Sequence, residues 1–310
     1  MHPKMSVEAI CALFGKTRQA YYQRLSYKYE EVAEESIILD LIAEYRSEMG
    51  KIGGRKLWHE LNPRLPEGIG RDRLFDILDR HHLKVYRRRR TIRTTWSESW
   101  LHQFPNLVKD MVLTAANQVW VSDITYIETA EGFVYLHLVT DAYSKKIMGW
   151  WLSPSLHAEY TIAALQMAIR NAGCDLTGMI HHSDRGCQYC CEKYVKLLQD
   201  NHIKISMTQD GDPRDNAIAE RVNGILKTEW LNDEHFKGYA DALQRVAEVI
   251  NIYNNRRPHL SLNYKTPAQA YLEEGLQQRV WKNYYKGNKP EKVAVVIAEL
   301  TSGCRTAAAY

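Results

Sequence analysis

Three acidic residues of this chain, Asp123, Asp184 and Glu220, could together bind a divalent cation. Asp123 interrupts an apolar, β-rich run, where a carboxylate is costly to bury without a partner or a cation. Asp184 directly follows a predicted strand, and open α/β sheets place ligands at the carboxyl ends of their strands. Glu220 lies in a predicted helix. Oxygen ligands from three separate elements favour Mg²⁺ or Mn²⁺ over zinc.

Two such cations, about 3.5–4 Å apart, can activate an attacking oxygen and stabilise the leaving oxygen of a phosphodiester. We therefore expect Asp123, Asp184 and Glu220 to be the metal ligands and the catalytic residues of a phosphoryl-transfer enzyme, with two ions bound. Each acid also has a structural interpretation. Asp123 or Asp184 could shape a turn, and a helical Glu commonly faces solvent.

Side chains near Glu220 are expected to support this site. Lys227 lies two helical turns after Glu220, so both emerge on nearly the same face, and Lys227 could contact the DNA backbone. Asn216 could hydrogen-bond a carboxylate or DNA, or it could cap the helix. His181 and His182 could orient water or phosphate, although a packed histidine is an equally good interpretation.

The order of the predicted elements indicates the fold. Residues 118–127, 133–140 and 146–152 are β-rich runs separated by short turns, which predicts a three-stranded antiparallel meander. Helix and strand then alternate, with helices over residues 157–171, 194–199 and 215–230 and strands over residues 178–182 and 203–207. Asp215 is expected to cap the last of these helices. This order is typical of a ribonuclease-H-like α/β fold.

The first hundred residues are predicted to form short helices. Ser6 and Thr17 are candidate caps for two helices separated by Gly15, a pattern typical of a helix-turn-helix. Apolar residues at helical spacing follow over residues 37–45 and 74–78. The alternative interpretation is a plain helical bundle without a role in DNA binding.

Positive charge is concentrated in one stretch of a chain whose net charge is only +4. Residues 51–93 contain 13 Lys and Arg against 5 Asp and Glu, which predicts a polyanionic partner. The cations expected to bind DNA are Lys227, Arg55, Arg71, Arg73, Arg87, Arg88, Arg89, Arg90, Arg256 and Arg257. A cation at a helix end also stabilises the helix itself, which is the alternative role for Arg256 and Arg257.

Length and composition limit the class of protein. With 310 residues, of which 45% are hydrophobic, the chain can bury one large core and a smaller one. No apolar run approaches the ~18 residues needed to span a bilayer, and the first ten residues lack a secretory signal, so we expect no membrane partner and a cytoplasmic location.

The six cysteines are expected to be reduced. Cys187 and Cys190 allow a zinc interpretation, but a structural zinc site normally brings a second spaced pair.

The motifs in their order resemble those of a known family. They are Trp120-x-x-Asp123-x-Thr125-Tyr126, then His181-His182-Ser183-Asp184-Arg185-Gly186-x-Gln188-Tyr189, then Asp215-Asn216-Ala217-x-x-Glu220. This order resembles the DDE catalytic core of retroviral integrases and bacterial insertion-sequence transposases, and more narrowly the second-reading-frame product of the IS-three family. Lys227, seven residues after Glu220, fits that group, as does the stretch Tyr253-Asn254-Asn255-Arg256-Arg257-Pro258-His259.

The resemblance implies a ribonuclease-H-like fold, magnesium dependence, and cleavage and strand transfer at the ends of an insertion sequence. The implied partners are double-stranded DNA of the terminal inverted repeats and of the target, and further copies of the chain assembled on DNA. An upstream-frame DNA-binding partner, separate or joined as a frameshift fusion, is also implied. The chain departs from the family at Cys187, Cys190 and Cys191, where the family usually has small polar residues.

The expected organisation has five parts. They are a helix-turn-helix-like segment over residues 1–30, a basic helical DNA-binding domain over 31–90, a linker over 91–112, a ribonuclease-H-like integrase core over 113–275 and a tail over 276–310. Two rival functions follow from the same residues. One is a nuclease that hydrolyses DNA without strand transfer, and the other is a DNA-binding regulator whose carboxylates have no chemical role.

Overall fold

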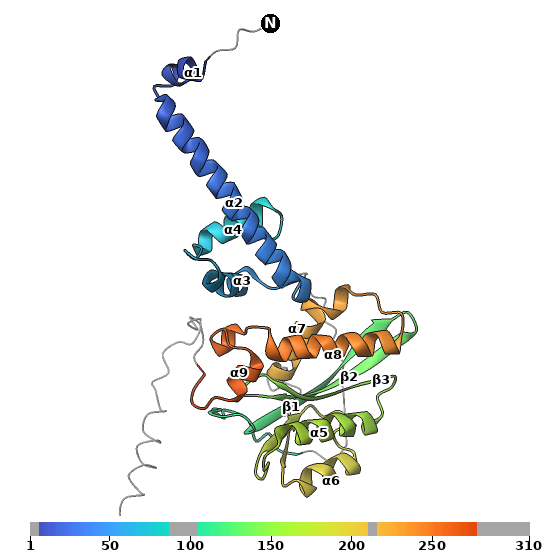
Figure 1. Ribbon diagram of the computed structural model, residues 1–310. Coiled ribbons are helices and arrows are strands. Elements are labelled where there is room, and N and C mark those ends of the chain that lie inside the picture. The colour runs from blue at the N-terminus through green and yellow to red at the C-terminus, as the bar shows by residue number, and fades with distance from the viewer. Residues whose placement is uncertain (1–5, 87–103, 210–215, 278–310) are drawn as a thin grey trace, which may run out of the picture.

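The computed structural model describes residues 6–86, 104–209 and 216–277, which form a helical region and an α/β core (Figure 1). The helical region contains α1 (Val7–Leu13), α2 (Arg18–Glu48), α3 (Gly54–Leu61) and α4 (Arg71–Arg80). The core contains β1 (Val119–Thr129), β2 (Gly132–Asp141), β3 (Ile147–Ser153), α5 (Ala158–Ala172), β4 (Ile180–Ser183), α6 (Glu192–Asp200), β5 (Lys204–Met207), α7 (Ala217–Glu229), α8 (Tyr239–Asn255) and α9 (Pro267–Tyr271). The predicted order of strands and helices in the core is confirmed.

A five-stranded mixed sheet with the order β3-β2-β1-β4-β5 forms the centre of the core. The first three strands are an antiparallel meander, in which Tyr126 of β1 pairs with Tyr135 of β2. The strands β4 and β5 then add in parallel to the free side of β1. This is the strand order of the ribonuclease-H-like fold that the sequence predicted.

Helices cover both faces of the sheet (Figure 1). On one face α5 and α6 pack on a cluster that includes the buried Trp120, Leu165 and Leu198. On the other face α7 and α8 pack on a cluster that includes Leu136 and Val246. Because apolar side chains alternate between the two faces of a strand, β1 and β2 contribute to both clusters.

The helical region differs from the expected series of short helices. Ser6 and Thr17 do cap α1 and α2, and Gly15 lies between them with a φ of 63°. However, α2 continues without a break for 31 residues, so the expected boundary at residue 30 lies inside a helix. The physical reason is that no Gly or Pro occurs between residues 18 and 48 to stop the helix. Within the described ranges no helix is long and apolar enough to cross a membrane.

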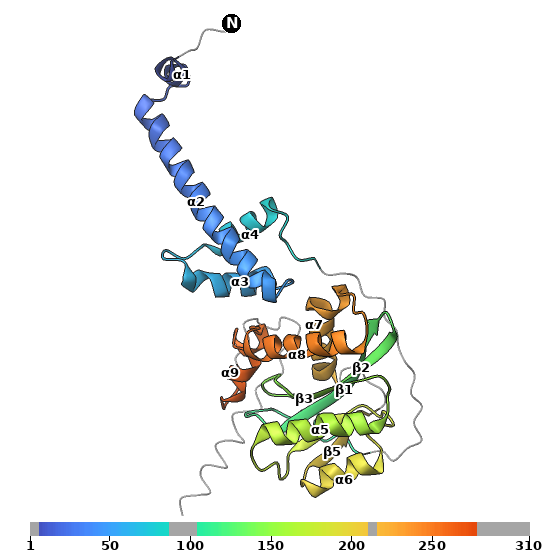
Figure 2. The same cartoon turned by 45° about the vertical axis from the view of Figure 1, so that its right-hand side comes forward.

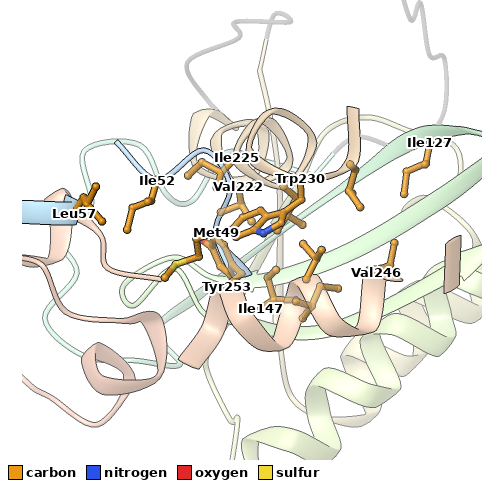
Figure 3. Packing of buried hydrophobic residues seen from close by; sticks show 14 of the residues in the cluster. Met49, Ile52, Leu57, Ile127, Ile147, Val222, Ile225, Trp230, Val246 and Tyr253 are labelled. Atoms are coloured by element: carbon orange, nitrogen blue, oxygen red, sulfur yellow. The ribbon is translucent and has the colours of Figure 1, made fainter. Parts of the chain in front are cut away.

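The helical region packs directly against the core beside α7 and α8. Met49, Ile52 and Leu57 belong to the same buried cluster as Trp230 and Tyr253 (Figure 3). The indole nitrogen of Trp230 donates a hydrogen bond to the carbonyl oxygen of Glu48 over 2.8 Å. The N-terminal half of α2 extends away from this contact (Figure 2).

The expected linker is shorter than residues 91–112, because its second half lies on the core. The amide of Leu107 donates to the Ser206 hydroxyl over 2.9 Å, and Phe104 packs on the α5–α6 cluster. Residues 87–103, and with them Arg87, Arg88, Arg89 and Arg90, lie outside the described residues. At the other end the core extends to Gly275, whose amide donates to the Thr114 carbonyl. Most of the predicted tail, residues 278–310, is also outside the described ranges.

The contact between β3 and α5 gives a stability prediction. A Cβ on Gly149 would collide with the carbonyl oxygen of Ala164 and lie 2.6 Å from the amide nitrogen of Ala168, both of which are backbone atoms that cannot rotate away. We expect Gly149→Ala to lower the free energy of unfolding by about 2 kcal/mol or more, measured by urea denaturation. Gly50→Ala is the matched control, because a Cβ there meets only one atom, at 3.7 Å. Equal stability of the two variants would contradict this packing.

Candidate active site

The two aspartates lie where the neighbouring strands β1 and β4 separate. The last parallel pair between these strands is Val121 with His182. Asp123 lies two residues beyond that pair on β1, and Asp184 follows the last residue of β4. Asp123 and Asp184 therefore lie just beyond the last paired residues of two adjacent parallel strands, close enough for the charge of Asp184 to act on Asp123.

Asn216, the residue before α7, connects that helix to the point where the strands separate. Its side-chain amide donates to the carbonyl oxygen of Ser122 over 3.1 Å, and Ser122 is the residue after the last β1–β4 pair. Asn216 occupies the N-cap position, but its side chain makes no capping hydrogen bond. It therefore anchors α7 to β1. The expected cap, Asp215, lies outside the described residues.

The electrostatics of Asp123 reflect its acidic neighbours. Its carboxylate accepts hydrogen bonds from the side chain of Asn223 over 2.7 Å and from the amide of Ile124 over 2.9 Å. Burial raises the pKa of Asp123 to about 7, and the nearby charges of Asp184 and, less strongly, Glu220 add to the increase. The two hydrogen bonds oppose this shift without cancelling it. The side chain is thus a half-buried acid that lacks a positive partner among these groups.

Asp184 and Glu220 are held differently. Asp184 is exposed on one side, and its Oδ1 accepts a hydrogen bond from the amide of Gly186 over 3.0 Å. Desolvation by the surrounding chain raises the pKa of Asp184. Glu220 lies in the first turn of α7 and its side chain is exposed. As the described side chains lie, no three His, Cys, Asp or Glu residues are grouped closely enough to hold a metal ion.

Asn223 is a site residue that the sequence analysis missed. It is buried on α7 and is the side chain that contacts Asp123. The available signal was its spacing, because Asn223 follows Asn216 by seven residues, or two helical turns, and so faces the same strand. A buried asparagine on an otherwise apolar helix face is also unusual, since burial of an amide requires hydrogen-bond partners.

Lys227 lies on the same face of α7, one helical turn beyond Asn223. Its ammonium group donates to the hydroxyl of Thr125 over 3.3 Å and lies over the ring of Tyr126, 4.0 Å from the centroid. Both residues belong to β1 and follow Asp123 closely. The expected contact of Lys227 with DNA stays a prediction, but the side chain is at the same sheet edge as the acids.

The two histidines of β4 are buried and hydrogen-bonded, and the expected supporting role of His182 stays a prediction. His182 is fully buried, and its Nδ1 hydrogen-bonds the Ser206 hydroxyl of β5 over 2.8 Å. The Nε2 atom of His181 hydrogen-bonds Ser122 and Tyr194. These side chains therefore tie β4 to the adjacent strands and to α6.

Arg257 is the clearest correction among the residues expected to bind DNA. It is 2% exposed, and its guanidinium group binds both carboxylate oxygens of Glu229, over 2.6 and 2.7 Å. The Nζ atom of Lys56 lies 3.6 Å from the same carboxylate. His259 lies 2.8 Å from Arg257, and burial, followed by the charge of Arg257, lowers the pKa of His259 well below its usual value. A neutral His259 can therefore accept a hydrogen bond from Arg257.

The other expected DNA-binding arginines that the structure describes lie at the surface. Arg55 and Arg256 are exposed, and Arg256 is paired with Glu48 over 3.2 Å. Arg73 pairs with Glu34 of α2 over 2.9 Å. Arg71 also pairs at the surface, over 2.8 Å with the adjacent Asp72. Exposed ion pairs of this kind contribute little to stability and can exchange for a phosphate partner.

The cysteines near Asp184 are free thiols. Cys187 is exposed, whereas Cys190 and Cys191 are partly buried. The predicted reduced state of these three residues is what the structure shows. The hydrogen bond that Asp184 accepts comes from the backbone of Gly186 and involves none of these three thiols.

The sequence of this chain is similar to those of known integrases and transposases. Residues 114–213 and residues 201–267 each match a family model described as an integrase core domain. The insertion element IS600 uncharacterized 31 kDa protein of Shigella sonnei is 34% identical over 271 residues, which cover 86% of this chain and 98% of that protein. The transposase for insertion sequence element IS629 of Shigella sonnei is 32% identical over 222 residues, which cover 70% of this chain and 73% of that protein.

The chain belongs to the insertion-sequence transposases that carry an integrase core domain. Transposase InsF for insertion sequence IS3A of Escherichia coli K12 is also similar, with 35% identity over 53% of this chain and 57% of that protein. Among solved structures, the HTLV-2 integrase catalytic core domain in complex with magnesium is 21% identical and covers 52% of this chain and 99% of that chain, with a TM-score of 0.40. The function of this family is DNA transposition, and its reaction class is polynucleotidyl transfer.

The buried ion pair of Arg257 with Glu229 predicts a large loss of stability when Arg257 is removed, and the adjacent, exposed Arg256 offers a control. Removal of the guanidinium in Arg257→Ala leaves Glu229 buried with Lys56 as its remaining cation in this cluster, so we expect a loss of about 3–5 kcal/mol in the free energy of unfolding. Arg256→Ala removes an exposed pair and should cost less than about 1 kcal/mol. Urea denaturation measures both. If Arg257→Ala keeps full stability and loses DNA affinity, the original DNA-binding interpretation was right.

The hydrogen bond from Asn223 gives a prediction about pH. Because this bond stabilises the charged form of Asp123, its removal in Asn223→Ala should raise the pKa of Asp123 further above its value of about 7. The carboxyl carbon of Asp123, observed by NMR in the protein stripped of metal, would then titrate at higher pH. Asn251→Ala, an exposed asparagine on α8, is the control. An unchanged titration in Asn223→Ala would show that this bond has no electrostatic role.

Proposed function

We propose that Asp123, Asp184 and Glu220 are the metal-binding catalytic residues of a transposase that cuts the ends of an insertion sequence and joins them to target DNA. The observation that carries the proposal is the convergence of Asp123 and Asp184 just beyond the last residue pair of β1 and β4. Asp123 also responds to the charge of Glu220, so the third acid acts on the same place from α7. The family relationship sets the reaction class, and the acids are the side chains suited to perform it.

The residues present fit a divalent cation. Asp123 and Asp184 supply oxygen atoms, and burial raises the pKa of each, with the charge of Asp184 adding to the increase at Asp123. A cation between them would remove that penalty, and oxygen-only ligands suit Mg²⁺ or Mn²⁺. Glu220 would complete the set by turning its exposed side chain toward the two aspartates. When bound, one or two such ions would polarise the scissile phosphate and lower the pKa of the attacking hydroxyl.

The chain's own side chains would have distinct tasks in the reaction. Asn223 holds the Asp123 carboxylate through one oxygen, and Asn216 fixes the start of α7 against β1. Lys227 would hold a backbone phosphate of the element end beside these acids. Water would first attack the phosphodiester at the element end and release a 3′-hydroxyl. That hydroxyl would then attack a phosphodiester of the target and displace a second 3′-oxygen, without a covalent bond to the protein.

The helical region would supply the DNA-binding surface outside the core. It carries the concentration of Lys and Arg between residues 51 and 93, and Arg55 and Arg71 are exposed on it. Cations that neutralise phosphates give affinity that falls with salt and carries no base information. We also propose that copies of the chain assemble on the two ends of the element, alone or with an upstream-frame partner.

The test is strand transfer by purified protein on a duplex that carries the terminal inverted repeat of the element. Asp123→Asn, Asp184→Asn and Glu220→Gln should each lower cleavage and joining by about 10²- to 10³-fold or more, because each removes a charge from the reaction centre. Melting temperature and duplex affinity should change little. Glu192→Gln is the control, since Glu192 is likewise an exposed acid in the first turn of a helix, α6.

Two results would contradict the assignment. Near-normal joining by Glu220→Gln in magnesium would remove Glu220 from the site. Shortened strands without any joined product in the wild type would instead indicate a nuclease on this fold. Calorimetric titration with Mn²⁺ gives an independent measure, because the Asp184→Asn variant should lose binding that the Glu192→Gln variant retains.

A further inference from the structure

An aromatic pair on the exposed end of the β1–β2 hairpin lies next to Lys227. Tyr126 of β1 and Phe133 of β2 are 48% and 53% exposed, although both are large apolar side chains. Their rings are 5.3 Å apart and nearly perpendicular, at 80°. Tyr126 pairs in register with Tyr135, so Phe133 is its diagonal neighbour two residues along β2. Diagonal neighbours of this kind lie on one face of a sheet and are within reach of aromatic side chains.

Lys227 approaches this pair from α7. Its ammonium group lies 4.0 Å from the centre of the Tyr126 ring and donates to Thr125 over 3.3 Å. In the sheet, β4 pairs with β1 only as far as Val121, so no described strand pairs with this edge of β1 between Ser122 and Glu128. Lys227 can therefore reach both the hydroxyl of one residue and the ring of the next.

The two contacts restrict a side chain that is otherwise very mobile. A lysine has four rotatable bonds, and fixing them for each DNA contact costs conformational entropy. Contact with a ring face and a hydroxyl orders the ammonium group before DNA arrives. Thr125 and Tyr126 are neutral, so neither of them neutralises the positive charge of Lys227. Thr125 is two residues from Asp123, which places the ordered charge about 7 Å along the strand from the acid.

We propose that Tyr126, braced by Phe133, is a positioning residue for transposition that holds Lys227 ready for the DNA phosphate next to the one attacked. The proposal rests on the proposed function of Lys227 and of the acids. Its ligand class is the phosphodiester backbone of the element end. The alternative occupant of the aromatic pair is an unpaired nucleobase stacked directly on Tyr126, and the experiment below separates the two.

The first measurement tests, without DNA, whether Lys227 lies over the ring of Tyr126. Protons on the ε-carbon of a lysine that lies over an aromatic ring resonate at unusually high field. Lys146 also lies 4.0 Å from the centre of a ring, that of Tyr271, so with ¹³C-labelled lysine we expect such signals from both lysines. The signal that disappears in Lys227→Arg is the one from Lys227. Tyr126→Phe should keep the signal because it keeps the ring, whereas Tyr126→Leu should lose it. Trp151→Leu, an exposed aromatic of β3, is the control that should leave it unchanged.

The second measurement concerns the element end. We would measure affinity for a terminal-repeat duplex in calcium, and then how joining in magnesium depends on the concentration of DNA. Tyr126→Leu should bind the end two- to five-fold more weakly, which is about the value of an exposed cation–π contact. Tyr126→Phe should retain wild-type affinity. Phe133→Leu should weaken affinity by less than Tyr126→Leu. The limiting rate of joining at saturating DNA should change little in each variant.

A double-mutant comparison decides between positioning and direct base contact. In a Lys227→Met background, Tyr126→Leu should have no further effect if Tyr126 acts through Lys227. The same loss in both backgrounds would overturn the proposal and favour a base stacked on Tyr126. Loss of the high-field signal without any change in end affinity would overturn it as well. Absence of strand transfer by the wild type would refute the proposed function. The NMR result would still report whether Lys227 contacts the ring of Tyr126.

Discussion

The carboxylate of Glu229 holds together the parts of the molecule on which the site depends. It lies at the last residue of α7 and binds Arg257 of the segment after α8 and Lys56 of α3. Burial would raise the pKa of Glu229, but the hydrogen bonds and charge of Arg257 outweigh it and keep the pKa low. Burial, assisted by Arg257, lowers the pKa of Lys56 to about 8. One carboxylate shared by two buried cations makes the helical region and α7 a single unit.

Because Glu229 fixes the C-terminal end of α7, the other side chains of α7 are held in place beside the proposed reaction centre. Along one face it contacts three nearby residues of β1, through Asn216 at Ser122, Asn223 at Asp123 and Lys227 at Thr125. Eleven residues of helix rise about 16 Å, whereas the strand between the first and last contact spans about 10 Å, so the helix crosses the strand obliquely. Glu220 emerges between the first two contacts, and its backbone position is therefore set from both sides.

The sequence was sufficient for the features that depend on local pattern. Strand runs, turns and the spacing of Asp123 and Asp184 follow from alternation and from residues that end strands, and both acids lie where expected. Features that depend on distant partners were not predictable. Arg257 has the local pattern of a solvent-facing cation at a helix end, and Glu229, 28 residues away, is what buries it. The capping signal for α2 was correct, but no local signal supported the expected boundary at residue 30, because the first Gly after residue 18 is Gly50.

The long helix α2 acts as a lever arm. With 31 residues it is about 46 Å long, and its C-terminal end is the one fixed to the core through Met49 and Trp230. A tilt of about 10° at that end would move its free end, where α1 is attached, by about 8 Å, or roughly two base-pair steps of DNA. The side-chain packing around Trp230 therefore limits how far α1 can be displaced by a tilt of α2. A repacked core beneath α7 would therefore change how far α1 reaches from the core.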